Sequence, residues 1–198
     1  MSKITSAAAP KAARHSMTTR TLAGCALLAA MSVVLARFVI PMPAVDQRFS
    51  LEAVPIFIAG MLFGPIPGAL VGFSADLVGC LFSGYGYNPL FCVPPILYGL
   101  SAGLFRPLLL KKTTPLTIGL SFLPPIALGS ILYQSATLAY VYGKGAFLPN
   151  FLVKLSTRSV QFAITFVLDV LVVYLLYKSK VFTAVRLWPA AQKTEDKE

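Results

Sequence analysis

Six apolar segments, separated by short turns rich in proline and glycine, constrain the fold of this chain more than any other feature. They cover residues 21–40, 53–63, 68–82, 90–110, 116–142 and 151–177. Of the 198 residues, 57% are hydrophobic and only 12% are charged. A soluble domain of this length could not hide that much apolar surface, because much of so small a fold stays in contact with water. The pattern therefore predicts an all-α integral membrane protein with six transmembrane helices in one bundle.

The second and third segments are short for straight membrane spans. They are joined by the sequence GPIPG at 64–68, whose prolines and glycines predict a tight turn and hence a helical hairpin. Non-helical backbone at membrane depth has to be buried in protein or face a cavity. We therefore expect the loops before the second segment and after the third to lie beside a binding cavity.

The basic residues give a topology. The net charge is +10, from 17 Lys and Arg against 7 Asp and Glu. With six spans, twelve of the 17 fall on one side: four before the first segment, three at the end of the fourth and five after the sixth. The positive-inside rule then predicts both termini in the cytoplasm. We expect a disordered basic tail over 1–19, the six-helix domain over 20–178 and a polar cytoplasmic tail over 179–198.

Several kinds of chemistry are not expected. The single histidine is His15 in the basic tail, and the three cysteines are scattered through apolar segments, so no disulfide framework, metal site or histidine-based catalytic site is predicted. The sequence has no G-x-x-x-x-G-K-[ST] phosphate loop, so the chain is not expected to hydrolyse ATP itself. The basic charge suggests topology rather than nucleic-acid binding.

A cluster of charged residues is predicted on the outer side. Arg37 ends the first segment, Arg48 and Glu52 precede the second, and Arg158 lies near the outer end of the sixth with Gln161 one turn deeper. Arginines from different helices suit an anionic solute, because a guanidinium group binds a carboxylate through two parallel hydrogen bonds. Cations that reach the membrane interface, together with structural ion pairs, are the alternative.

Two carboxylates lie inside apolar segments. Asp76 is near the middle of the third, where an intramembrane carboxylate favours a functional role. Asp169 is deeper in the sixth and closer to its cytoplasmic end, so we expect a structural role and a basic partner there.

The loop with Tyr85, Tyr87 and Asn88 combines aromatic faces, hydrogen bonding and flexible glycines, which suits a ligand-covering loop or an interfacial aromatic belt.

Small residues recur four apart on three segments, which allows close helix contact. Gly68 and Gly72 form such a pair on the third segment, and Gly99 and Gly103 on the fourth. Ala26 and Ala30 form another on the first, where a partner subunit is an alternative to packing within the chain.

The stretch from Arg48 to Gly79 resembles the central signature of the substrate-binding S components of energy-coupling-factor (ECF) vitamin transporters, and within them the folate type. The resemblance is carried by Arg48, Pro55, the turn GMLFGP at 60–65, and Asp76 with Gly79. The sequence ALLAAMSVVLARF resembles the first span of this family, and RSVQF resembles the end of its last span.

The resemblance implies a six-helix fold with a cavity open to the outside, in the plasma membrane of a prokaryote. It implies a folate-like vitamin as ligand, and docking through Ala26 and Ala30 on a membrane coupling subunit with two ATPases. No cofactor is implied, since ATP is used only by the partners. The candidate substrate-binding residues are Arg37, Arg48, Phe49, Glu52, Asp76, Tyr85, Tyr87, Asn88, Arg158 and Gln161.

Three alternatives remain open at this point. The chain could bind another vitamin or anionic small molecule within the same class. It could be a membrane scaffold protein without transport, in which the charged cluster is structural. It could also be a small membrane enzyme that uses Asp76 as acid or base, although one isolated carboxylate supports this poorly.

Overall fold

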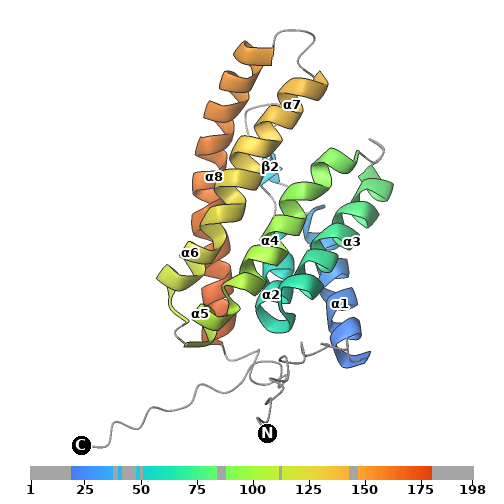
Figure 1. Cartoon of the computed structure of the whole chain (residues 1–198), viewed down its shortest axis with the longest axis vertical. Helices are drawn as coiled ribbons and strands as arrows, with labels where there is room; N and C mark the ends of the chain where they lie inside the picture. The colour runs from blue at the N-terminus through green and yellow to red at the C-terminus, as the bar shows by residue number, and fades with distance from the viewer. Residues whose placement is uncertain are drawn as a thin grey trace, which may run out of the picture.

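The computed structural model of the chain describes residues 19–37, 40–41, 48–49, 51–83, 88–111, 113–142 and 147–179. These residues form a helical bundle (Figure 1). Its helices are α1 (Thr19–Leu35), α2 (Ala53–Phe63), α3 (Pro65–Ser83), η1 (Pro89–Cys92), α4 (Val93–Leu104), α5 (Arg106–Lys111), α6 (Pro115–Pro124), η2 (Pro125–Tyr133), α7 (Gln134–Tyr142) and α8 (Phe147–Lys178). Two short strands, β1 (Ile40–Pro41) and β2 (Arg48–Phe49), pair antiparallel, with Ile40 opposite Phe49.

Every predicted apolar segment contains a helix, and the second matches α2 residue for residue. The first helix is shorter than predicted, since α1 ends at Leu35 and Ile40 belongs to β1. Two segments are subdivided in ways that the sequence analysis did not predict. The fourth gives α4 and α5, which meet at Phe105. The fifth is one continuous helix whose middle third, η2, is a π-helix that begins at Pro125. Pro124 and Pro125 both lack a backbone N–H, so the ordinary α-helical hydrogen bonding cannot continue through them.

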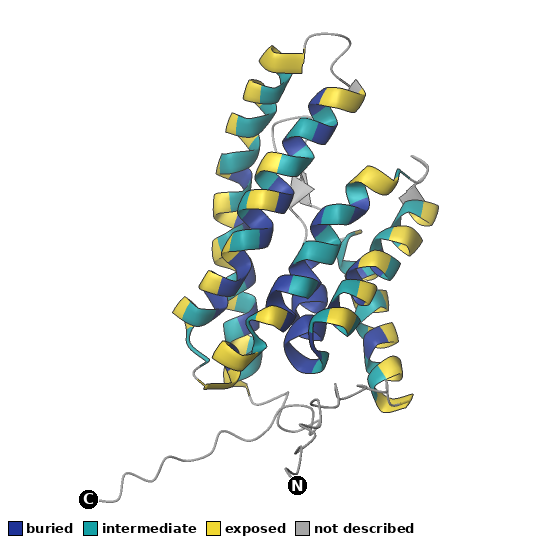
Figure 2. Cartoon of the chain, in the orientation of Figure 1, coloured by how far each residue is buried: buried dark blue, intermediate teal, exposed yellow. Residues whose placement is uncertain are grey.

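Three helical stretches are long and apolar enough to cross a membrane: Pro65–Phe82, Pro115–Val141 and Phe147–Lys178. Shorter apolar helices cover Thr19–Leu35, Ala53–Phe63 and Pro89–Leu104. Large hydrophobic side chains are exposed on the outward faces of these helices, where Figure 2 is mostly yellow. The protein is therefore an all-helical membrane protein, while the count of six spans stays a prediction.

The start of α1 and the end of α8 lie at the same end of the bundle (Figure 1). That arrangement is compatible with termini on one side of the membrane. Which side this is depends on the positive-inside argument alone and stays a prediction.

Helix α2 forms the centre of the end of the bundle where α1 begins, and it is buried along almost its whole length (Figure 2). The predicted hairpin is confirmed: Gly64 alone separates α2 from α3, and its φ of 105° lies in the region that favours glycine. A β-carbon added to Gly68 would lie 2.5 Å from the Cα of Gly60, and one added to Gly99 would overlap the backbone of Gly68. Backbones of α2, α3 and α4 thus touch directly, which confirms the predicted close contact.

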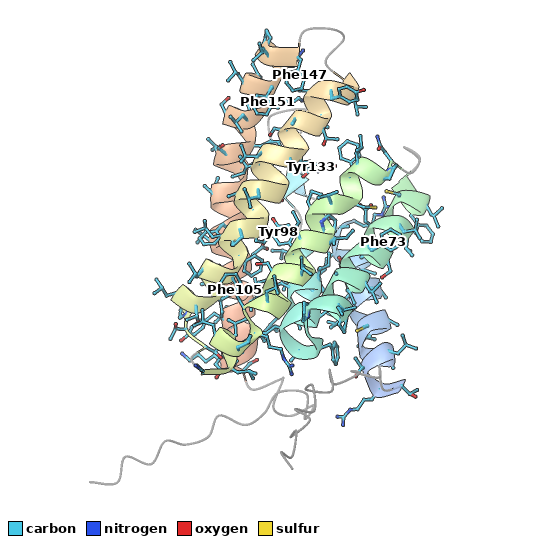
Figure 3. All side chains as sticks on the ribbon, in the orientation of Figure 1. Phe73, Tyr98, Phe105, Tyr133, Phe147 and Phe151 are labelled. Atoms are coloured by element: carbon cyan, nitrogen blue, oxygen red, sulfur yellow. The ribbon has the colours of Figure 1, made fainter. Side chains whose placement is uncertain are left out.

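Aromatic packing joins this glycine-packed unit to the long helix α6–η2–α7. The rings of Phe57 on α2 and Phe122 on α6 are stacked, with centroids 3.8 Å apart and an interplanar angle of 11°. Tyr98 on α4 meets Phe122 edge-on at 6.1 Å. Tyr98 therefore lies in the interior of the bundle (Figure 3). A buried tyrosine hydroxyl usually has a hydrogen-bond partner.

Candidate ligand-binding site

A cavity of about 330 Å³ lies between α2, α3, α4, η2 and α8. Its wall includes aromatic side chains, among them Phe91, Tyr98 and Phe162, and polar side chains, four of which come from α8. Cavities of this size that combine apolar walls with a few polar groups are typical of small-molecule sites. The cavity is therefore the candidate ligand-binding site.

The polar side chains of α8 form one face that runs along the cavity. Arg158, Gln161, Thr165 and Asp169 are spaced three, four and four residues apart, and all four belong to the cavity wall. This spacing places them on one side of a helix over a length of roughly 16 Å. We call these four residues the α8 polar face. Arg158 lies at one end of this face and the carboxyl group of Asp169 at the other.

Arg158 is held in place by two contacts. Its Nε donates a hydrogen bond to the backbone oxygen of Ser130 over 3.3 Å. Its guanidinium carbon lies 5.4 Å from the centroid of the Phe162 ring, which is cation–π geometry. The Ser130 hydroxyl and the Tyr98 hydroxyl are 3.0 Å apart and share a hydrogen bond. These contacts connect α8, η2 and α4, and the two terminal guanidinium nitrogens have no hydrogen-bond partner among the described residues.

Asp169 occupies the other end of the α8 polar face. Its side chain has no exposed surface, and neither carboxyl oxygen accepts a hydrogen bond from the described part of the chain. The basic partner expected for Asp169 is therefore absent among the described residues, while the structural role expected for it stays a prediction. Its position in the cavity wall follows from the four-residue spacing that continues from Gln161 through Thr165, a signal that the sequence already contained.

A second, smaller cavity of about 180 Å³ adjoins the first, between α1, α2 and α3. Both cavities have Glu52 and Asp76 in their walls, so these carboxylates stand where the two meet. Arg37 lines only the second cavity, and its Nη2 donates a 2.8 Å hydrogen bond to the backbone oxygen of Gly79. The Ser32 hydroxyl donates to the backbone oxygen of Glu52 over 2.8 Å and fixes the entry to α2.

Asp76 is tied to neighbouring thiols. The Cys92 thiol donates to Oδ2 of Asp76 over 2.7 Å, and the Cys80 thiol is 4.0 Å from the same oxygen. The contact joins α3 to η1 at the edge of both cavities. Among the residues that the structure describes, no group of three histidine, cysteine or carboxylate side chains could hold a metal ion.

The structure thus brings together five of the predicted site residues. Arg37, Glu52, Asp76, Arg158 and Gln161 line the two adjoining cavities.

The other five predicted site residues are placed differently. Arg48 and Phe49 form β2, and only their backbone is described. Asn88 lines neither cavity; its side chain accepts a 3.1 Å hydrogen bond from the backbone N–H of Leu90 and caps η1. Tyr85 and Tyr87 lie outside the described residues.

The sequence analysis missed several residues of the cavity wall. Besides Thr165 and Asp169, these are Phe91, Tyr98, Ser130 and Gln134. The last three come from the fourth and fifth apolar segments, where isolated serine, glutamine and tyrosine side chains are also common as ordinary packing residues. No spacing in the sequence distinguishes them.

Exposed apolar helices around a small polar cavity define a membrane-embedded binding protein. A protein-family model described as "ECF-type riboflavin transporter, S component" matches residues 16–180, so the chain belongs to this family of transporter S components. Members of the family are substrate-binding transport subunits, so the protein is not an enzyme.

Two individual proteins are similar to the chain. The crystal structure of FolT bound with folic acid superposes with a TM-score of 0.69 at 27% identity, covering 82% of this chain and 95% of FolT. The uncharacterized protein MG098 homolog of Mycoplasma pneumoniae is 36% identical over 64 residues, which are 32% of this chain and 13% of that protein. The chain thus spans only a small part of this curated relative, which supports no conclusion on function.

Proposed function

We propose that the protein is the high-affinity substrate-binding subunit of an ECF-type vitamin importer, and that its ligand is folate or a reduced folate. The observation that carries the proposal is the similarity to FolT, whose crystal structure contains folic acid, over 95% of the FolT chain. The polar cavity lies within the same bundle and is the site where we place the ligand.

Folate suits the chemistry of the cavity. Its pterin ring is flat and can pack against the aromatic wall that includes Phe91, Tyr98 and Phe162. Its glutamate carboxylates match arginines, and the two adjoining cavities offer Arg158 and Arg37. We assign Arg158 to the carboxylate end, because among the described residues its terminal nitrogens have no hydrogen-bond partner and can form the bidentate pair.

Riboflavin is the second candidate, since the matching family model is described as a riboflavin transporter S component. Calorimetric titration of the purified protein with folic acid, 5-formyltetrahydrofolate and riboflavin separates the two. We expect tight binding of the folates and weak binding of riboflavin. Tight riboflavin binding without folate binding would overturn the folate assignment, and mass spectrometry of small molecules that co-purify provides an independent check.

Transport against a gradient needs energy from partner subunits, because the sequence has no ATP-binding loop. We propose that the protein works in the plasma membrane of a prokaryote, as a multi-pass subunit that docks on a membrane coupling subunit with two ATPases. The docking surface is the outward face of α1. Ala26 and Ala30 are exposed on this face, while Gly24 on the opposite side packs against Phe63 of α2.

A bulky side chain on this face should block docking without reaching the cavity. We expect Ala26→Trp and Ala30→Trp to abolish ATP-dependent uptake in proteoliposomes with the coupling module, while the isolated protein still binds its ligand. Leu171→Trp is the matched control, because Leu171 is 52% exposed on α8, which lies on the other side of the bundle from α1 (Figure 1). Full uptake by both alanine variants would place the docking surface elsewhere.

A further inference from the structure

We propose that Asp169 selects ligands whose buried end carries two neighbouring N–H donors, as the 2-amino-4-oxopyrimidine ring of a pterin does. The inference rests on the proposed function, since it concerns the same cavity. It goes further by assigning the residue that distinguishes pterins from flavins and by fixing the orientation of the ligand.

The first step is the state of the Asp169 side chain. It is fully buried in the cavity wall, and neither oxygen accepts a hydrogen bond within the described residues. A buried carboxyl group without donors is costly, and natural proteins seldom keep one without a use. Because Asp169 belongs to the cavity wall, the two unused acceptors indicate donors that arrive with a ligand.

The second step is the chemistry of the donors. A carboxylate presents two oxygens side by side, and the pterin ring presents its N3–H and its 2-amino group side by side, so two parallel hydrogen bonds can form. The isoalloxazine ring of a flavin has one N–H between two carbonyl groups. Its carbonyl oxygens would face the oxygens of Asp169, and like partial charges repel. Asp169 therefore favours a pterin and disfavours a flavin.

The third step is the polarity of the cavity. Arg158 and Asp169 lie at opposite ends of the α8 polar face, roughly 16 Å apart along the helix. A ligand with an acidic tail and a donor-rich head matches this order, with the tail at Arg158 and the head at Asp169. Asp169 has no exposed surface in the structure, so binding of the head at Asp169 requires side chains of the cavity wall to move.

The test compares two ligands with two proteins. The ligands are folic acid and an analogue in which a methyl group replaces the 2-amino group, so that one of the two donors is absent. The proteins are wild type and Asp169→Asn, which keeps the shape but turns one acceptor into a donor. Thr157→Val is the matched control, because its hydroxyl lies on an exposed part of α8 and bonds only to backbone oxygens.

For wild type and for the Thr157→Val control, we expect folic acid to bind at least about tenfold more tightly than the analogue, the loss typical of a charge-assisted hydrogen bond. In Asp169→Asn the preference should shrink to less than threefold. Without ligand, Asp169→Asn should melt at the same temperature as wild type or higher, because it removes an unpartnered buried carboxyl group.

Three results would overturn the inference. Equal wild-type affinities for folic acid and the analogue would do so while leaving the proposed function intact. A lower melting temperature of Asp169→Asn, together with equal loss of both ligands, would show that Asp169 is structural. Wild type that binds riboflavin but no folic acid would refute the folate assignment itself, and the role of Asp169 with it.

Discussion

Replacement of Arg158 by alanine tests which end of the cavity binds the carboxylates. The guanidinium group is positioned by the Ser130 backbone oxygen at 3.3 Å and by the Phe162 ring at 5.4 Å, so it is already oriented before a ligand arrives. Arg158→Ala removes the charge and the hydrogen bonds but leaves the helix intact, since alanine is a strong helix former. We expect weaker binding of folic acid with little loss of protein stability.

The magnitude follows from the kind of contact that is lost. A hydrogen bond to a charged group contributes about 1.5–3 kcal/mol. Each 1.4 kcal/mol corresponds to a factor of ten, so the dissociation constant should rise roughly 10- to 150-fold. Arg158→Lys should recover part of this loss, because lysine keeps the charge but not the planar fork that binds a carboxylate through two hydrogen bonds. Arg37→Ala should cost less, since Arg37 is exposed and its Nη2 already donates to Gly79.

The assay is calorimetric titration with folic acid and with its diamide, in which both glutamate carboxylates are amidated. Arg158→Ala should lose affinity for folic acid but change the affinity for the diamide less than threefold. Lys178→Ala is the control, because Lys178 is an exposed cation at the far end of the same helix. Equal losses for folic acid and the diamide would refute the assignment of Arg158 to the carboxylates.

Two further predictions concern packing and topology. Gly68→Ala should destabilise the protein by about 1–3 kcal/mol, because its methyl group would overlap the backbones of α2 and α4. In thermal unfolding Gly79→Ala on the same helix should cost nothing, since a methyl group there meets no atom within 4 Å; equal losses would contradict the packing argument. Single cysteines at Gly84 and Gly145, both outside the described residues, should react only with reagents added from outside the cell, and labelling from the cytoplasm would defeat the six-span topology.

The helices were predictable because their signals are local and strong. Long apolar runs ended by proline, glycine or charged residues leave few alternatives in a membrane, and the bounds of α2 and its turn at Gly64 follow directly. The π-helical turn at Pro125 was missed, because apolar composition does not show how two consecutive prolines are accommodated. The strands β1 and β2 are two residues each, too short to give a period in the sequence.

The site was predictable only in part, because a cavity wall depends on which helix faces meet. Charged residues near the segment ends were recognised, and Arg158 and Gln161 line the cavity with Glu52. The place of Asp169 in the cavity wall was missed, because the sequence analysis considered how deep it lies along the segment and not which face of the helix it is on. Asp169 follows Arg158 by eleven residues, which is three helical turns, so both lie on the same side of α8. No sequence pattern marked Tyr98 as a residue of the cavity wall, since its hydroxyl is positioned by a hydrogen bond to Ser130 in another segment.

The glycine contacts explain how the bundle keeps a polar cavity. Helices α2, α3 and α4 touch backbone to backbone at Gly60, Gly68 and Gly99, so none of the three can move closer to the others. Glycines also provide no side chains to fill the space beside these contacts. The cavity lies beside this incompressible unit, and its other wall is the long helix α8 with its polar face. Collapse of the cavity would have to bury the wall residues Glu52, Asp76 and Arg158, which are only partly buried or exposed, and burial of charged groups is unfavourable. The polar groups of the wall therefore also keep the cavity open.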